Sequence, residues 1–187
     1  IAVLGAGSWG SALAQVLSEN KKTSITILHH NAYYDTHSHF KYFSDIPIPK
    51  EINITSNKND IIDADIFFIV QPTKVINETL DWINKYSTSN SPIIVNCSKG
   101  FDYKSKMTFY QLVSKKFPRL KDTYCILSGP SHAEEVVNKL PTAVVVASNN
   151  ISNAEKIQNL FSNKYFRIYT SVDIIGVEVG AACKNII

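Results

Sequence analysis

Residues 1–20 read IAVLGAGSWGSALAQVLSEN, and this stretch decides the fold. Gly5, Gly7 and Gly10 form a G-x-G-x-x-G pattern between an apolar strand and an amphipathic helix. The bare pattern is weak, but this context is what a dinucleotide-binding turn requires. Gly5 allows the tight turn, Gly7 leaves room for the pyrophosphate, and Gly10 lets the helix pack close to the strand. A glycine-rich turn without a ligand is the alternative.

The second strand should end with the group that contacts the ribose of a bound dinucleotide. It ends in Leu28-His29-His30-Asn31, without an acid. An acid would bind the 2′-hydroxyl and repel a 2′-phosphate, whereas histidine and asparagine accept either. We therefore expect NADP, or NADP and NAD both, over strict use of NAD. The alternative is that these are ordinary polar residues at a strand end.

Short β-branched runs alternate with helix-length amphipathic stretches along the rest of the chain. This alternation predicts an α/β fold, a Rossmann-like, doubly wound and mostly parallel sheet with helices on both faces. Segment 31–50 is polar and is predicted to be a loop, and a last helix is predicted to begin at Asp173. The expected strands are 1–4, 24–29, 52–55, 66–70, 92–97, 123–128, 143–147 and 165–169, and further helices are expected at 73–86, 107–117 and 153–161.

Composition excludes several classes of protein. The chain has 187 residues, a net charge of +3 and 19% charged residues, so neither disorder nor a nucleic-acid partner is indicated. No apolar run approaches the roughly 18 residues of a membrane helix, and the start lacks a signal-peptide pattern. Three widely spaced cysteines fit the cytoplasm, and Cys97 and Cys125 are predicted to be core residues.

Candidate ligand-binding residues follow two of the predicted strands. Lys99 follows strand 92–97, and Ser128-Gly129-Pro130-Ser131 ends strand 123–128. Ligands of open α/β sheets lie beyond the carboxyl ends of the strands, although a lone lysine there can simply be solvated. Ser131 to Glu134 also fit a capping box that starts a helix, and such an end can hold an anionic or polyhydroxy ligand.

Three residues in the last segment share one helix face. Gly176, Gly180 and Lys184 are four residues apart, so the two glycines would clear space in front of the lysine. Close helix packing beside a snorkelling lysine is the alternative. Asp35, His37 and His39 alternate, so an extended chain would place them on one side as metal ligands, but no fourth ligand is suggested, and we expect no metal site.

These blocks together resemble the N-terminal part of bacterial NAD(P)-dependent glycerol-3-phosphate dehydrogenases. The resemblance spans nearly the whole chain, with the blocks in the family's order, and the long blocks are specific. The matching blocks are GAGSWGSALA at 5–14, QPTK at 71–74, SKG at 98–100, LSGPSHAEEV at 127–136, LPTAVVVAS at 140–148 and FRIYTSVDIIGVEVGAACKNII at 166–187.

The resemblance implies that dihydroxyacetone phosphate and NAD(P)H are converted to sn-glycerol 3-phosphate, which supplies phospholipid synthesis. It also implies roles for individual residues. Lys184 would donate and accept the proton, and Lys99 would touch both cofactor and substrate. A second positive charge nearby, for which Lys99 is the candidate, would help Lys184 release its proton. The implied nucleotide contacts are Ser8, Trp9, His30, Ala133 and Glu135, and the implied substrate contacts are Gly129, Ser131 and Asn185.

The sequence departs from the family in three places. Ala181 stands where a second glycine is usual, Gln71 replaces an apolar residue, and the loop after His30 is shorter. The chain starts with Ile1 and stops without a helix stop signal, so we expect a piece of a longer protein. Residues 1–171 would form the dinucleotide-binding domain, and 172–187 would begin a helical substrate domain. In the family, the remainder of that domain carries an Arg-Asn pair that binds the substrate phosphate.

Alternative functions remain open at this level. A non-catalytic NAD(P)-binding redox sensor could use the same fold, because function lies in the site and not in the fold. The presence of both Lys99 and Lys184 favours an enzyme, since a sensor needs no such pair. A related phosphosugar or hydroxyacyl dehydrogenase is disfavoured by the SGPSHAEE and GAACKN blocks. A homodimer is left open.

Overall fold

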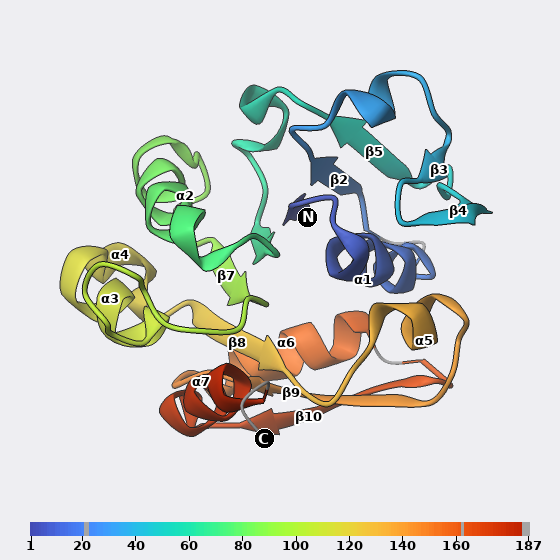
Figure 1. Ribbon diagram of the computed structural model, residues 1–187. Helices are drawn as coiled ribbons and strands as arrows, with labels where there is room; N and C mark the ends of the chain where they lie inside the picture. The colour runs from blue at the N-terminus through green and yellow to red at the C-terminus, as the bar shows by residue number, and fades with distance from the viewer. Residues whose placement is uncertain (21–22, 162, 185–187) are drawn as a thin grey trace.

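The computed structural model describes residues 1–20, 23–161 and 163–184, which form a three-layer α/β structure around an eight-stranded sheet (Figure 1). The strand order is β10-β9-β8-β7-β6-β1-β2-β5. The strands are β1 Ala2–Leu4, β2 Ile25–Leu28, β5 Ile52–Thr55, β6 Ile66–Ile69, β7 Ile93–Asn96, β8 Tyr124–Ser128, β9 Thr142–Ala147 and β10 Phe166–Ser171.

The chain reverses direction across the sheet between β1 and β6. It runs outward through β1, β2 and β5, then returns to place β6 on the other side of β1. These strands, with β7 and β8, are all parallel, so their carboxyl ends meet at one edge. The predicted mostly parallel, doubly wound sheet is confirmed. β9 runs antiparallel to β8, and β10 runs parallel to β9.

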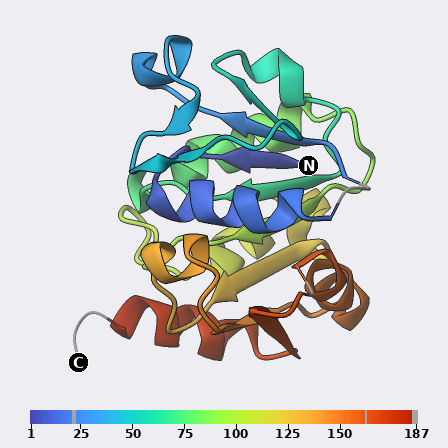
Figure 2. The ribbon, with the colours of Figure 1, turned by 90° about the vertical axis from the view of Figure 1, so that its right-hand side faces the viewer.

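Helices cover both faces of the sheet, each over its own apolar core. One face carries α1 Ser8–Ser18, α5 Ala133–Val137 and α6 Ile151–Phe161. The other face carries α2 Thr73–Tyr86, α3 Phe109–Lys116, α4 Pro118–Lys121 and α7 Ile174–Cys183. The view turned by 90° shows α1 and α5 in front of the strands (Figure 2). Burial of the central strands on both faces explains their continuous apolar sequences.

Segment 31–50 is not the loop that its polarity predicted. It holds the short helix η1 Ala32–Asp35 and an antiparallel pair, β3 His39–Phe40 and β4 Phe43–Pro47. Phe40 is fully buried against the α1-side core, with Phe43 and Ile46 packed beside it. Polar residues and proline separate these apolar side chains, which is why no strand period was visible. A second short helix, η2 Lys58–Ile61, follows β5.

The predicted last helix is confirmed as α7, and Asp173 is its N-cap. The Asp173 carboxylate accepts a hydrogen bond of 2.8 Å from the Gly176 amide. Ile174 and Ala181 of α7 are buried, and α7 packs on β8. A second domain starting at residue 172 stays a prediction. No helix in the described ranges is both long and apolar enough to cross a membrane.

Candidate active site

The glycine turn lies where the chain reverses between β1 and β6. Gly5 has a φ of +122°, and a Cβ there would lie 2.3 Å from the Val70 carbonyl oxygen. A Cβ on Gly10 would lie 2.0 Å from the Gly5 carbonyl oxygen. Both positions therefore exclude any side chain, as the sequence predicted for a tight turn and a closely packed helix.

Gly7 differs from the other two glycines because open space surrounds it. No heavy atom lies within 4 Å of the position that a Gly7 Cβ would take. Gly7 is the N-cap of α1 and no side chain caps the helix, so amides of the first turn are available to a ligand. The Tyr34 hydroxyl donates a 3.1 Å hydrogen bond to the Ala6 carbonyl and braces the turn from segment 31–50. This arrangement fits a dinucleotide pyrophosphate.

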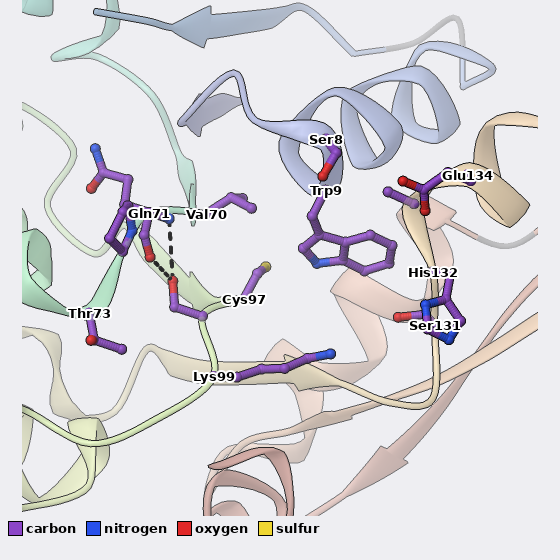
Figure 3. A pocket seen from close by; sticks show the side chains of 13 residues that line it. Ser8, Trp9, Val70, Gln71, Thr73, Cys97, Lys99, Ser131, His132 and Glu134 are labelled. Carbon is purple, nitrogen blue, oxygen red and sulfur yellow. Dashed lines mark hydrogen bonds between the residues drawn. The ribbon is translucent and has the colours of Figure 1, made fainter. Parts of the chain in front are cut away.

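A cavity of about 560 Å³ opens beside the turn (Figure 3). Four segments contribute to it: the start of α1, the ends of β6 and β7, and the segment before α5. The structure thus brings together Ser8, Trp9, Lys99, Ser131 and Ala133 from the sequence prediction. The cavity is lined by residues 8–9, 70–73, 97–99 and 131–134.

Several cavity residues were not singled out as site residues. Gln71, Thr73, His132 and Glu134 line the cavity, whereas the predicted contact Glu135 does not. Ser98 fixes this wall, because its hydroxyl donates to the Gln71 carbonyl at 2.6 Å (Figure 3). The position of these residues just beyond β6 and before α5 is the signal that could have identified them.

The predicted capping box at Ser131 is wrong. The helix begins at Ala133, its N-cap is His132, and no side chain caps it. His132 keeps an extended backbone, with φ of −116° and ψ of 135°, which starts the helix one residue later than the pattern indicated. Ser131 is buried and lines the cavity instead.

Lys99 and Lys184 meet at the site although they are far apart in sequence. Their side-chain amines are close enough for hydrogen bonding and for charge repulsion. Figure 3 shows Lys99 extending toward the side on which Ser131 and His132 lie. Lys184 donates a 3.5 Å hydrogen bond to the Gly129 carbonyl. The structure therefore supplies the proximity of the two lysines that the charge argument needs and that the sequence could not show.

The environment makes Lys99 easier to deprotonate. Burial lowers the pKa of Lys99 to about 8, and the positive charge of Lys184 and a hydrogen bond from it contribute further. A neutral Lys99 amine can accept a proton from the Lys184 ammonium, whereas two ammonium groups repel each other. Such a pair can deliver and retrieve a proton near neutral pH.

Lys184 also lines a second cavity of about 390 Å³ between α7 and the end of β8. Gly180 lines this cavity, and no heavy atom would contact a Cβ there, as predicted for a glycine that clears space. Gly176 does not share this role, because its missing Cβ makes room for the capping Asp173 carboxylate. The remaining lining residues are 128–130, Val145, Val177 and Ala181.

The other predicted positions are distributed as follows. His30 lines a separate cavity of about 170 Å³ with Lys58 and Trp82. Asn185 lies outside the described residues. Cys97 and Cys125 are buried, and burial raises the pKa of both thiols. No group of three potential metal ligands occurs in the described part of the chain. Asp35 lies in η1, so the extended arrangement weighed for Asp35, His37 and His39 is not formed.

Gly129 is expected to be intolerant of any side chain. An alanine Cβ there would lie 2.9 Å from Val144 Cα and 3.0 Å from the Ala143 carbonyl oxygen, both backbone atoms of β9. Gly129→Ala should therefore lower the free energy of unfolding by about 1–3 kcal/mol, measured by urea denaturation. The control is Gly180→Ala, whose Cβ meets nothing. Equal stability of the two variants would contradict the close approach of β9.

Comparison with known proteins agrees with this geometry. The family model for the N-terminus of NAD-dependent glycerol-3-phosphate dehydrogenase matches residues 1–154. A glycerol-3-phosphate dehydrogenase (NAD(P)+) of Lactiplantibacillus plantarum is 41% identical over 195 residues, covering 100% of this chain and 58% of that protein. The Bacillus pumilus protein of the same name is 40% identical, covering 100% of this chain and 56% of its own length.

Solved structures give the same picture. The crystal structure of glycerol-3-phosphate dehydrogenase from Coxiella burnetii superposes with a TM-score of 0.87 at 27% identity, covering 99% of this chain and 57% of that chain. The Plasmodium falciparum structure, at 23% identity and a TM-score of 0.88, shares the fold. The chain thus spans somewhat more than half the length of these proteins.

Proposed function

Since this chain belongs to the NAD-dependent glycerol-3-phosphate dehydrogenase family, matched over residues 1–154, we propose that it takes part in interconverting dihydroxyacetone phosphate and sn-glycerol 3-phosphate with NADP or NAD. The observation that carries this proposal is the pair Lys99–Lys184 beside the glycine-turn cavity. The product would supply the glycerol phosphate backbone of phospholipids. A cytoplasmic location stays a prediction, and a homodimer stays open.

The glycine turn and the cavity fit a nicotinamide dinucleotide. The open space at Gly7 and the uncapped start of α1 would receive the pyrophosphate, with Ser8 and Trp9 beside it. His30 would face the ribose, and Ala133 would lie against the nucleotide, as Glu135 would by resemblance. When bound, the cofactor supplies or accepts a hydride.

The lysine pair would handle the proton. Reducing a ketone leaves negative charge on its oxygen, which an ammonium stabilises and then protonates. Lys184 is proposed as the proton donor and acceptor, and Lys99 as the neighbour that stabilises the charge. Gly129, Ser131 and Asn185 are proposed substrate contacts. In the reverse reaction the neutral amine accepts the proton from the alcohol.

The test is loss of nicotinamide absorbance on adding dihydroxyacetone phosphate, with NADPH and NADH in parallel. It is run on this chain and on an extended enzyme, in which the remainder of the Lactiplantibacillus plantarum relative follows residue 187. We expect ketone-dependent oxidation by the extended enzyme, with NADPH at least as effective as NADH. A folded extended enzyme that binds NADPH without oxidising it would favour the redox sensor instead.

The pKa of Lys99 predicts opposite pH dependences for the two directions. Ketone reduction needs the positive charge of Lys99 to stabilise the developing negative charge, so kcat should fall as pH rises through about 8 and Lys99 loses its proton. Alcohol oxidation needs a neutral amine, so kcat should rise over the same range. The measurement is kcat in both directions from about pH 6 to about pH 10. Profiles that slope the same way would contradict proton transfer by this pair.

A further inference from the structure

Glu178 is a buried acid in the otherwise apolar helix α7. It is 2% exposed, although its neighbours in sequence are apolar residues and glycine. The Tyr124 hydroxyl donates a 2.6 Å hydrogen bond to Glu178 Oε1. The Tyr110 amide at the start of α3 donates to both carboxylate oxygens, at 3.1 and 3.2 Å. These donors offset the cost of burying a carboxylate, which would otherwise destabilise the fold.

The hydrogen bonds continue from Glu178 to the segment that carries Lys99. Asn96 Nδ2 donates to the Tyr124 hydroxyl at 3.1 Å, and the Ser98 amide donates to Asn96 Oδ1 at 3.0 Å. Ser98 directly precedes Lys99. The hydrogen-bonded chain Ser98–Asn96–Tyr124–Glu178 therefore runs from the end of β7, across β8, to α7.

The other end of this hydrogen-bonded chain is Glu178, which is linked to Lys184 through helix α7. Lys184 follows Glu178 by six residues, which is about 9 Å along a helix axis. Ile174 packs in the apolar core on this face of the sheet and Ala181 is buried, but an apolar side chain forms no hydrogen bond to the segment that carries Lys99. Among the described side chains, Glu178 is the one on α7 that joins this hydrogen-bonded chain.

We propose that the chain Ser98–Asn96–Tyr124–Glu178 sets the spacing between Lys99 and Lys184, with Glu178 as a positioning residue for the pair. Glu178 itself touches neither cavity. The groups that face it are the Tyr124 hydroxyl from β8, the Tyr110 amide from α3 and Thr108 at the start of α3. The expected effect on kcat rests on the proposed function. The spacing of the two lysines does not, because it is a property of the folded polypeptide.

The spacing can be measured without substrate or nucleotide. Peptide mass spectrometry measures the rate at which acetic anhydride labels Lys99 at a series of pH values. The midpoint of the curve of rate against pH reports the Lys99 pKa. Glu178→Gln and Tyr124→Phe each interrupt the chain while keeping side-chain size. In both variants α7 should shift and Lys184 should move away, so the midpoint should rise from about 8 by about half a unit or more.

The sign of the change separates positioning from a direct charge effect. Removing a negative charge at residue 178 would by itself lower the pKa of a nearby lysine, whereas removing the neighbouring ammonium raises it. Tyr124→Phe changes no charge at neutral pH, so its effect comes from geometry. Lys184→Gln provides the upper limit of the rise.

Ile157→Val, a buried change in α6 on the opposite face, is the control for general loosening. The proposal would be overturned if the midpoint of Lys99 labelling stayed the same or fell in both Glu178→Gln and Tyr124→Phe. It would also be overturned if Ile157→Val raised this midpoint by the same amount. In the extended enzyme, Glu178→Gln and Tyr124→Phe should each lower kcat and leave the KM for NADPH unchanged. A rise in midpoint without any ketone-dependent oxidation by the unaltered extended enzyme would reject the proposed function and retain the positioning role.

Discussion

Replacing Lys184 by glutamine in the extended enzyme is expected to lower kcat for ketone reduction by about 10²–10⁴-fold, the usual contribution of a positioned acid. NADPH binding should stay nearly unchanged. Lys184 lines the cavity between α7 and β8, whereas Ser8 and Trp9, which follow Gly7 of the glycine turn, line the other cavity. Steady-state kinetics and a calorimetric titration with NADPH measure the two quantities separately.

Lys156→Gln is the matched control for this prediction, because Lys156 lies exposed on α6, away from the lysine pair. It should leave both kcat and NADPH affinity unaltered. If Lys184→Gln weakened NADPH binding by as much as it lowered the rate, Lys184 would be a nucleotide contact and not the proton donor.

Gly7→Val is expected to abolish tight nucleotide binding without harming the fold. The valine would enter open space, and the extended backbone of residue 7, with φ of −74° and ψ of 179°, accepts a β-branched side chain. It would keep the pyrophosphate from the amides of α1. Losing two hydrogen bonds to charged groups, at about 1.5 kcal/mol each, weakens binding by about 10²-fold.

NADPH titration and thermal unfolding of the 187-residue chain measure these two effects. Gly180→Ala is the control, because its Cβ also meets nothing and because Gly180 lines the second cavity and not the one beside the glycine turn. It should keep NADPH affinity. Unchanged affinity of Gly7→Val would mean that the nucleotide does not approach this turn.

Most of the sheet could be predicted from sequence because its strands are buried on both faces. Continuous apolar runs such as 66–70 and 92–97 left little ambiguity about β6 and β7. The antiparallel direction of β9 could not be predicted, because the apolar run at 143–147 is compatible with either strand direction. The pair β3–β4 was missed because Phe40, Phe43 and Ile46 are separated by polar residues.

The site could be predicted only where its residues are contiguous in sequence. Strand, turn and helix adjoin at Gly5, Gly7 and Gly10, so their roles follow from local geometry. The meeting of Lys99 with Lys184 depends on how α7 packs against β8, which no local pattern encodes. Glu178 was overlooked, although a single acid within the apolar run 174–183 was a readable signal.

The central claim is that a nicotinamide nucleotide binds at the glycine turn with its reactive end beside the lysine pair. The most direct measurement is a crystal structure of this chain with NADPH. The account predicts the pyrophosphate against Gly7 and the first turn of α1, with the nicotinamide ring next to Lys99 and Lys184. A nicotinamide ring pointing away from both lysines, or a nucleotide bound elsewhere, would contradict it.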